Sequence, residues 1–455
     1  MMITIDLLRR YDRPAPRYTS YPPAPAFGEE FTESEYRALL AQRDPRRPLA
    51  LYAHLPFCDT LCYFCGCTMR VSHNRDFMRA YLESLLEEIA LLREALSDTG
   101  SVVQMHWGGG TPTYYETEAL LRLTEAFRAA FPFDPEAEIS VEADPRGLEF
   151  EKLAALRQAG FNRISIGVQD FDPRVQEAVN RLQPYELVAQ VSEWVRELGF
   201  YSLNFDLIYG LPYQTVERFA RTLELVLTLR PDRLAVFRYA HVPHLRPHQR
   251  LIPSEALPSA EVSWQIFAYT VERLTAAGYV YIGMDHFALP DDALSRAQVE
   301  GTLQRNFMGY TTHADADLLA VGMSGIGELE AAYVQNTRDL SRYREMIRQG
   351  RLPVAAGYRM SFDDRLRRFV IRQLMNYGFL DKPRIEAQWG IDFDTYFADA
   401  LRALTTLAED GLLELDPDRI RVTFAGRLLI RHVARCFDVH SARLEEKGFR
   451  FSRVI

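Results

Sequence analysis

The sequence lacks long apolar runs and any excess of positive charge. No stretch of its 455 residues approaches the roughly 20 apolar residues that a membrane-spanning helix needs. The formal net charge is −9, which argues against a general binder of nucleic acid or of anionic membranes. No secretory signal is apparent in the first residues. We therefore expect a cytoplasmic protein, in which any acidic substrate is met by a local basic pocket.

Cysteine is scarce, yet four of the five cysteines lie within ten residues. These four are Cys58, Cys62, Cys65 and Cys67, whereas Cys436 lies far along the chain. Packing does not explain such crowding, because free cysteines usually scatter singly through a core. The CxxxCxxC spacing of the first three allows one loop to hold three corners of a cubane iron–sulfur cluster. The fourth iron would then remain open to a small-molecule ligand.

Other interpretations of the cysteine loop are weaker. Structural zinc usually takes two ligand pairs separated by a longer stretch, and no second CxxC follows the loop. A disulfide framework is unexpected in a long chain with an odd number of cysteines. Cys67 leaves one alternative open, because as a fourth ligand it would close the site.

Beyond this loop, short β-rich runs alternate with amphipathic segments of helical period. The β-rich runs span residues 49–57, 102–107, 138–143, 163–169, 202–208, 233–240 and 279–285. The segments of helical period span 76–96, 116–130, 185–198 and 216–229. This alternation predicts an α/β protein with a parallel sheet and right-handed crossovers.

Six such units favour an open or closed βα barrel over a doubly wound sheet. Barrel enzymes build their sites at the carboxyl ends of the strands, and unusual polar or small residues recur there in this chain. They are Cys58, Gly108, Gly109, Gly110, Glu142, Gln169, Asp206, Ala240 and His241. We predict that these residues form one functional rim.

The two ends of the chain read differently from its middle. Residues 14–23 are rich in proline and should be extended, as a docked segment or lid rather than a disordered tail. Residues 401–433 read as helix, strand, strand, helix, which is typical of a winged helix. We predict an N-terminal arm over 1–35, a barrel over 36–353 and a mainly helical C-terminal domain over 354–455. The arginines of the last part do not outweigh the acidic chain, so we expect no nucleic-acid partner.

Two features of the rim suggest ligand binding. The Gly108–Gly110 run lets backbone groups approach a ligand closely, so it is a candidate seat for the amino group of S-adenosylmethionine. Glu142 and Asp206 end strands inside apolar runs, where a carboxylate could bind ribose hydroxyls or an ammonium group. Gln169 and Arg181 could offer a neutral and a cationic partner to a carboxylate.

The motifs of the whole chain resemble those of a known family. YAHLPFC, the cysteine loop and GGGTPT resemble the radical S-adenosylmethionine superfamily. More narrowly, the chain resembles the oxygen-independent coproporphyrinogen III oxidase (coproporphyrinogen dehydrogenase) family. The motifs that carry this resemblance are PRYTSYP, LCYFCGC, HWGGGTPTY, GVQDF, DLIYGLP, GMDHFA, RNFMGYTT and FSRVI.

The resemblance implies a three-quarter (β/α)6 barrel of the radical SAM type. It implies a 4Fe-4S cluster on Cys58, Cys62 and Cys65, with Cys67 not a ligand. It also implies two adjacent S-adenosylmethionine molecules. Positions that match the first molecule's site are Tyr52, Gly109, Glu142 and Ile326, and those that match the second are Phe64, Gly110, Thr111, Gln169, Arg181, Asp206 and Ala240. The catalytic set that it implies is Tyr52, His54, Glu142, Phe307 and Ile326.

The activity implied by the resemblance belongs to anaerobic haem biosynthesis. Reductive cleavage of S-adenosylmethionine would give a 5′-deoxyadenosyl radical that attacks a propionate of coproporphyrinogen III. Two oxidative decarboxylations would leave vinyl groups and yield protoporphyrinogen IX. The implied partners are this substrate and a low-potential electron donor such as flavodoxin or ferredoxin, acting on a monomer.

Two details of the chain bear on the substrate. Arg17 and Arg305 are candidates for pairing with its carboxylates. Relatives often carry glutamine where this chain has Met308, and a thioether cannot donate a hydrogen bond. Two alternative functions are a related enzyme acting on another tetrapyrrole and a haem-binding protein that has kept the scaffold.

Overall fold

The computed structural model describes residues 5–454, which form two compact units. The larger unit comprises residues 28–270 and 315–359, and the smaller unit comprises the remaining described segments. Residues 1–4 of the predicted arm and residue 455 of the FSRVI motif lie outside the described residues. The division of the chain into 1–35, 36–353 and 354–455 stays a prediction.

Six parallel strands form the centre of the larger unit and neighbour one another in chain order. They are β1 (Leu49–Leu55), β4 (Val102–Gly109), β5 (Phe133–Ala143), β6 (Arg163–Gln169), β7 (Ser202–Tyr209) and β8 (Arg233–Arg238). The six predicted β-rich runs from 49–57 to 233–240 each overlap one of these strands, although β4, β5 and β7 extend beyond the predicted bounds. The parallel α/β architecture is therefore confirmed.

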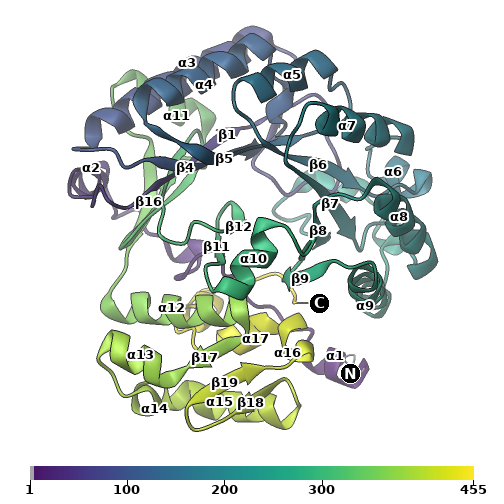
Figure 1. Cartoon of the computed structure of the whole chain (residues 1–455), viewed down its shortest axis with the longest axis vertical. Coiled ribbons are helices and arrows are strands. Elements are labelled where there is room, and N and C mark those ends of the chain that lie inside the picture. Colours follow the sequence, from purple (N-terminus) through teal and green to yellow (C-terminus); the bar gives the residue numbers. More distant parts are fainter. Residues whose placement is uncertain (1–4, 455) are drawn as a thin grey trace. The chain divides into compact units, whose positions relative to one another are not determined.

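Helices connect these strands, and Figure 1 shows them along the outer side of the sheet. They are α3 (Arg75–Ala95), α4 (Thr117–Ala130), α5 (Phe150–Gln158), α6 (Pro173–Ala178), α7 (Tyr185–Glu197) and α8 (Val216–Leu229). Helix α8 has the predicted bounds because Thr215 caps its start and Arg230 ends it in a left-handed conformation. On α3, Leu82, Leu85 and Ile89 recur at helical spacing and are buried.

The sheet continues past β1 through strands that sequence reasoning missed. Strand β13 (Asp317–Val321) pairs in parallel with β1, and β14 (Ile326–Leu329), β15 (Ala332–Asn336) and β16 (Val354–Arg359) follow in antiparallel order. The larger unit also contains α2 (Glu33–Ala41), α11 (Leu340–Arg348), the short pair β2 (Phe57–Cys58) and β3 (Arg70–Val71), and the start of α9 (Ala260–Ala276).

Alternation along the strands separates the core from the site. In β7, Leu203, Phe205 and Leu207 are buried, whereas Asn204 and Asp206 point to the opposite face. Along β7, apolar side chains thus pack on one face of the sheet, and the predicted rim residue Asp206 lies on the other face with Asn204.

The smaller unit combines helices with small antiparallel sheets. Its helices are α1 (Ile5–Tyr11), α10 (Ala293–Glu300), α12 (Phe362–Tyr377), α13 (Lys382–Trp389), α14 (Phe393–Tyr396), α15 (Ala398–Glu409), α16 (Phe424–Leu428), α17 (Ile430–Arg435) and α18 (His440–Glu446). Its strands are β9 (Val280–Gly283), β10 (His286–Ala288), β11 (Gln304–Asn306), β12 (Gly309–Thr311), β17 (Phe379–Asp381), β18 (Leu413–Leu415) and β19 (Arg419–Val422).

The predicted helix, strand, strand, helix order over 401–433 is present with one difference. The final helix is broken at Leu429 into α16 and α17. Gly426 packs so closely that a side chain there would lie 1.9 Å from the carbonyl oxygen of Leu412. The absence of a side chain at Gly426 therefore allows α16 to lie close to Leu412, the residue before β18.

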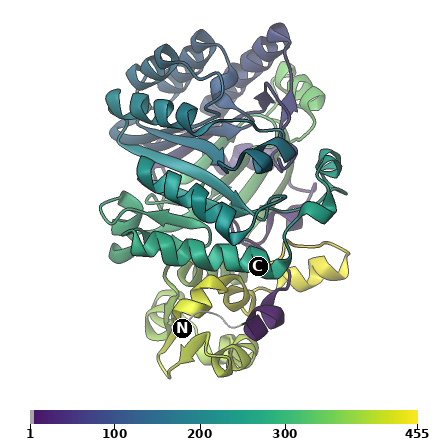
Figure 2. The same ribbon diagram turned by 90° about the vertical axis from the view of Figure 1, so that its right-hand side faces the viewer.

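The proline-rich segment 14–23 is docked within the smaller unit. The buried guanidinium of Arg431 donates hydrogen bonds to the carbonyls of Ala15 and Pro16 on this segment and of Arg453 near the other end of the chain. Figure 2 shows the purple N-terminal part beside the yellow C-terminal part. Among residues 5–454, no helix combines the length and apolar character needed to cross a bilayer.

Candidate functional site

The cysteine loop begins at the end of β2 and ends at β3, which pairs with β2 in a separate two-stranded sheet. Strand β2 contributes Cys58, and a turn between Cys62 and Cys65 is closed by a backbone hydrogen bond of 3.1 Å. Within the described part of the chain, no three histidine, cysteine, aspartate or glutamate side chains converge as they would on a single metal ion. A cubane cluster does not require such convergence, because each cysteine binds a different iron.

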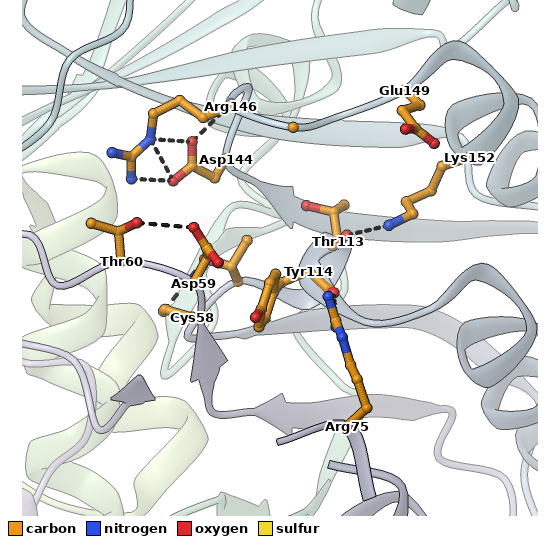
Figure 3. Close-up of a pocket in the computed structure, with 12 residues that line it drawn as sticks. Cys58, Asp59, Thr60, Arg75, Thr113, Tyr114, Asp144, Arg146, Glu149 and Lys152 are labelled. Carbon is orange, nitrogen blue, oxygen red and sulfur yellow. Dashed lines mark hydrogen bonds and ion pairs between the residues drawn. The ribbon is translucent and has the colours of Figure 1, made fainter. Parts of the chain in front are cut away.

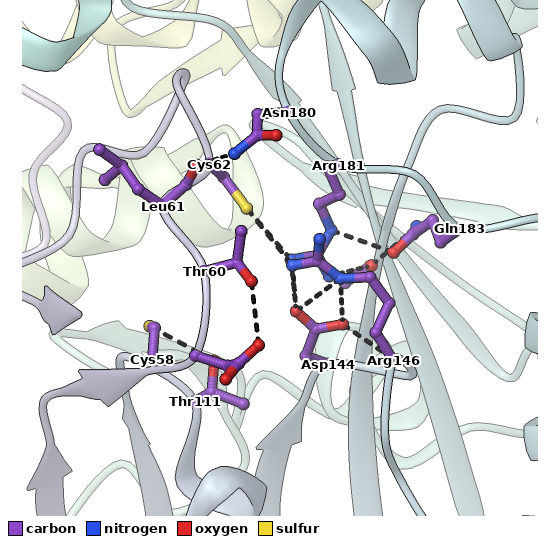
Figure 4. Close-up of polar contacts among 12 residues, drawn as sticks. Cys58, Thr60, Leu61, Cys62, Thr111, Asp144, Arg146, Asn180, Arg181 and Gln183 are labelled. Atoms are coloured by element: carbon purple, nitrogen blue, oxygen red, sulfur yellow. Dashed lines mark hydrogen bonds and ion pairs between the residues drawn. The ribbon is translucent and has the colours of Figure 1, made fainter. Parts of the chain in front are cut away.

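The sulfur atoms have different hydrogen-bond donors (Figure 4). Cys58 Sγ accepts a hydrogen bond from the Thr111 hydroxyl at 3.4 Å, and burial raises the pKa of this thiol to about 12. Cys62 Sγ lies 3.5 Å from Arg181 Nη1 and 3.6 Å from Arg146 Nη2. Donors aimed at sulfur stabilise a metal-bound thiolate. The loop therefore fits a cluster that would be held by Cys58, Cys62 and Cys65.

Cys67 has a different relation to the loop. A hydrogen bond from the Cys67 thiol lowers the pKa of Cys65 to about 7, and the same contact raises the pKa of Cys67. Cys67 itself is exposed, whereas Cys62 is buried. This contact places Cys67 beside Cys65, and the expectation that Cys67 is not a cluster ligand stays a prediction.

The glycine run lies between the cysteine loop and Glu142. The amide of Gly110 donates to the carbonyl of Leu55 at 2.9 Å, which ties the run to the start of the loop. A side chain at Gly109, whose φ is 115°, would lie 2.6 Å from the ring of His54. At Gly108 it would lie 2.9 Å from the carboxylate of Glu142. Only glycine allows this close approach.

Glu142 is held by two residues of β4, the strand that neighbours β5. The amide of Gly109 donates to Oε2 at 3.1 Å, and His106 Nε2 lies 3.3 Å from Oε1. Burial alone would raise the pKa of Glu142, but these hydrogen bonds and the charge of His106 leave it lowered. The group is therefore a carboxylate aimed along the same rim as the glycine run.

Tyr52 and His54 form a hydrogen-bonded chain that ends on the cysteine loop. Tyr52 Oη lies 3.0 Å from His54 Nδ1, and His54 Nε2 lies 2.8 Å from the carbonyl of Thr68. A carbonyl only accepts, so Nε2 carries the hydrogen and Nδ1 accepts from the tyrosine. Burial lowers the pKa of His54, so the ring is neutral. This geometry assigns His54 a role in anchoring the loop, and its predicted catalytic role stays a prediction.

The other predicted rim residues come from β6, β7 and the segments that follow them. Burial raises the pKa of Asp206 to about 6, and its carboxylate accepts hydrogen bonds from Ser165 and Asn204, each at 2.9 Å. A side chain at Gly167 would lie 2.6 Å from Gln169 Nε2 and 2.9 Å from Arg181 Nη2. Gly167 therefore leaves room for these two polar groups to share one edge of the sheet.

Ala240 and Phe64 are joined by a residue that sequence reasoning missed. Gln249 Nε2 donates to the carbonyl of Phe64 at 3.0 Å and to that of Ala240 at 3.2 Å. His248 Nε2 also lies 2.8 Å from the carbonyl of Cys65. The segment after β8 thus binds the cysteine loop, although no motif marks these two residues.

The remaining two predicted catalytic residues, Ile326 and Phe307, lie outside the six central parallel strands. Ile326 begins β14, which is two strands from β1 in the sheet. Phe307 belongs to the smaller unit, at the turn between β11 and β12, where its ring lies 6.5 Å from that of Phe27 in an edge-on contact. Met308 follows it, with its amide bound to Asn306 Oδ1 at 2.8 Å.

A cavity of about 510 Å³ opens beside Cys58 (Figure 3). Both cations and carboxylates line it, and Lys152 is fixed there by hydrogen bonds to the carbonyls of Thr113 and Tyr115 at 2.8 and 2.9 Å. The charged residues that line this cavity are Arg75, Arg146, Lys152, Asp59, Asp144 and Glu149.

The fold and the cysteine loop together define a radical S-adenosylmethionine enzyme. The family model described as "Radical SAM superfamily" matches residues 52–226, and the one described as "HemN C-terminal domain" matches residues 360–429. Superfamily membership implies a 4Fe-4S cluster and S-adenosylmethionine as cofactors, and the donors around Cys58 and Cys62 fit the cluster.

Full-length relatives narrow this class. Proteins named "Oxygen-independent coproporphyrinogen III oxidase" from Salmonella typhimurium and Escherichia coli (strain K12) are each 46% identical over 449 residues, covering 99% of this chain and 98% of the relative. A solved structure described as coproporphyrinogen III oxidase (HemN) from Escherichia coli, a radical SAM enzyme, has a TM-score of 0.90 at 47% identity. It covers 93% of this chain and 97% of the other. The chain belongs to the oxygen-independent coproporphyrinogen III oxidase family.

Proposed function

We propose that this chain converts coproporphyrinogen III to protoporphyrinogen IX by oxidative decarboxylation of two propionate side chains to vinyl groups. The observation that carries this proposal is the full-length similarity to enzymes named for that substrate. The cysteine loop supports it, because Cys58, Cys62 and Cys65 would hold three irons of a cluster and leave the fourth iron open to S-adenosylmethionine. The reaction serves anaerobic haem biosynthesis.

The cofactors supply the difficult chemistry and the chain positions them. When bound, the cluster and S-adenosylmethionine provide the one-electron step that removes a hydrogen atom from the propionate. Cys58, Cys62 and Cys65 would hold three irons. The tie between Gly110 and Leu55 and the contact of His54 with Thr68 fix the two ends of the loop.

We assign the predicted rim residues to two S-adenosylmethionine sites. Glu142 offers a carboxylate to the first molecule, and we assign Tyr52, Gly109 and Ile326 to the same site. Asp206 offers hydrogen-bond acceptors to the second molecule beside Arg181. Phe64, Gly110, Thr111, Gln169 and Ala240 complete this second site. The close approach of Gly109 to His54 and Glu142 supports the first assignment.

Substrate carboxylates require cations, and the smaller unit offers Arg305. This arginine is 4% exposed, and within residues 5–454 its Nε and Nη1 atoms have no hydrogen-bond partner. Its guanidinium lies 5.3 Å from the ring centre of Tyr310, whose hydroxyl also has no partner in the described structure. A buried guanidinium with free N–H groups is suited to a carboxylate. We assign Arg305 to a propionate of the substrate. We also assign Arg17 and Phe307 to contacts with the substrate.

The reaction also requires an electron from outside the chain. We propose a low-potential donor such as flavodoxin or ferredoxin, acting on a monomeric enzyme in the cytoplasm. The reducing environment of that compartment supports the last assignment, because it preserves free thiols such as those of the loop.

An anaerobic assay of the reconstituted chain tests the proposal. With reductant, S-adenosylmethionine and coproporphyrinogen III, we expect protoporphyrinogen IX and two molecules of 5′-deoxyadenosine for each product molecule. Deoxyadenosine without the porphyrin product would refute the substrate and favour a related enzyme acting on another tetrapyrrole. Tight tetrapyrrole binding without any cofactor cleavage would point to a haem-binding protein on the same scaffold.

A further inference from the structure

The polar network around Cys62 involves two residues that the proposed function leaves without a role. They are Asp144 and Arg146, which follow β5 directly. Figure 4 shows Asp144 between two guanidinium groups, and both of these groups reach the sulfur of Cys62. Arg181 is assigned to the second cofactor site, whereas Asp144 and Arg146 belong to neither site.

In this network, one terminal nitrogen of each arginine donates both to the carboxylate of Asp144 and to the sulfur of Cys62. Arg146 Nη2 donates to Asp144 Oδ2 at 2.7 Å and to Cys62 Sγ at 3.6 Å. Arg181 Nη1 donates to the same oxygen at 2.9 Å and to the same sulfur at 3.5 Å. Each terminal nitrogen carries two hydrogens, so one is directed at the carboxylate and the other at the sulfur. Asp144 thereby orients both cations toward Cys62.

Other contacts prevent the two arginines from turning away. Arg181 Nε donates to Gln183 Oε1 at 3.0 Å, and Arg181 Nη2 donates to the carbonyl of Gly167 at 2.7 Å. Arg146 Nε donates to Asp144 Oδ1 at 3.0 Å. The side chains of Arg181, Asp144 and Arg146 are 9%, 12% and 23% exposed, so solvent screens their charges only in part.

The charges of this network do not cancel. Two guanidinium groups and one carboxylate leave one net positive charge against the sulfur of Cys62. Cys58, by contrast, accepts its hydrogen bond from the neutral hydroxyl of Thr111. The positive charge of this network therefore acts more directly on Cys62 than on Cys58.

Charge and hydrogen bonds at the sulfur ligands are among the factors that set the reduction potential of an iron–sulfur cluster. Positive donors stabilise the extra electron of the reduced state, so they make a cluster easier to reduce. We propose that Arg146, oriented by Asp144, raises the reduction potential of the cluster through its hydrogen bond to Cys62. Arg146 is thus a positioning and tuning residue that acts through Cys62. This inference rests on the cluster assigned in the proposed function.

Redox titration of the anaerobically reconstituted full chain, followed by electron paramagnetic resonance, tests this role without any substrate. Arg146→Met removes the charge and the hydrogen bond while keeping most of the side-chain volume. We expect the reduction equilibrium to become about tenfold less favourable, which for one electron is a fall in midpoint potential of about 59 mV. Arg146→Lys keeps the charge but loses the planar fork, so its potential should fall between those of Arg146→Met and the unaltered chain.

Arg75→Met is the matched control. Arg75 lines the same cavity, but it donates to the carbonyl of Tyr114 at 3.0 Å rather than to a cysteine. This variant should keep the potential of the unaltered chain. An equal shift in Arg75→Met and Arg146→Met would overturn the proposal, because the effect would then be one of general charge.

Iron content separates tuning from folding. The proposal requires full iron in Arg146→Lys together with a shifted potential. Full iron with an unchanged potential in both Arg146 variants would overturn it, and so would loss of iron in both, because Arg146 would then hold the loop together instead. An unaltered chain that takes up no iron would refute the cluster assignment itself.

Discussion

The sulfur of Cys62 in the larger unit and the guanidinium of Arg305 in the smaller unit are both buried, but their polar neighbours differ. Cys62 receives hydrogen bonds from Arg146 and Arg181. Arg305 has two nitrogen atoms without partners in the described structure and lies against Tyr310. Asp144 completes the first network, whereas the second has vacant donors.

This difference indicates what each region does before it binds a ligand. A buried donor without a partner costs about 1–3 kcal/mol, so Arg305 destabilises the free protein. Such a cost persists where function requires it, and a carboxylate would remove it. The Cys62 network has its donors in place and needs only the cluster irons. We therefore regard the larger unit as organised for its cofactors and the smaller unit as prepared for an anionic substrate.

The largest expected effect is loss of the cluster in the larger unit. Cys58→Ser, Cys62→Ser and Cys65→Ser should each abolish cluster assembly and all activity, because three thiolates must hold three irons. Cys67→Ser is the matched control, because Cys67 is exposed and donates to Cys65. Iron content and the absorbance of the charge-transfer bands measure the outcome. A Cys67→Ser chain without iron would mean that four cysteines bind.

Glu142→Gln should have the next largest effect. The carboxylate would pair with a charged or hydroxyl group of S-adenosylmethionine, and hydrogen bonds to charged groups contribute about 1.5–3 kcal/mol. We expect cofactor affinity to fall by roughly tenfold to a hundredfold while iron content stays unchanged. Equilibrium binding of S-adenosylmethionine measures this. Glu149→Gln, a change at an exposed carboxylate that lines the cavity, should leave the affinity unchanged.

Arg305→Met tests the role of the smaller unit in substrate binding, because it should raise stability and weaken binding. Removing the unpaired donors should raise the free energy of unfolding by about 1–3 kcal/mol and weaken binding of the porphyrinogen by about tenfold. Thermal unfolding and quenching of protein fluorescence by the tetrapyrrole measure the two quantities. A variant that is less stable and binds normally would show that Arg305 is a structural residue. The exposed Arg402 serves as the control position.

The smallest effect on activity concerns Glu88 on α3. Its carboxylate accepts hydrogen bonds from Gly322, Asn336 and Tyr343 at 2.6–2.7 Å, yet burial raises its pKa from 4.5 to about 7. The native state therefore keeps its proton to higher pH than the unfolded state. Stability from this group is present below about pH 4.5 and is lost as the pH rises to 7, by an amount on the order of 3 kcal/mol. Denaturant unfolding at several pH values should show this slope in the unaltered chain, and Glu88→Gln should abolish it.

Asp364 in the smaller unit should give a dependence of stability on pH that is opposite in sign to that of Glu88. Burial alone would raise its pKa, but hydrogen bonds from His440 and Ser361 lower it to about 2. Its contribution is present above its ordinary pKa and is lost as the pH falls toward 2. A slope near neutral pH that Glu88→Gln leaves intact would assign the effect to another group.

Local sequence pattern predicted much of the larger unit. Strand β6 and helix α8 have the predicted bounds, because apolar residues at strand or helix period need no distant partner to be recognised. Strands β13–β16 were missed because they are short and glycines lie within or between them. Gly322, in the turn between β13 and β14, has a φ of 96°, and a side chain there would lie 2.7 Å from the carbonyl oxygen of His54.

The site itself was predicted only in part. The spacing of Cys58, Cys62 and Cys65 identifies them in the sequence, and the resemblance to the family implies Glu142 and Arg181. Asp144, Arg146 and Gln249 have no local signal, because each acquires its meaning from a contact with the cysteine loop. Arg305 is likewise an ordinary arginine until its burial is known.

The sequence by itself determined that this protein has a three-cysteine loop and six alternating strand and helix units, since both follow from residue type and short-range period. The tertiary structure alone decided which charges reach Cys62, because Arg146 and Arg181 lie 84 and 119 residues from it along the chain. Parallel strand order brings such distant segments to one edge of the sheet. Local spacing carries no record of that proximity.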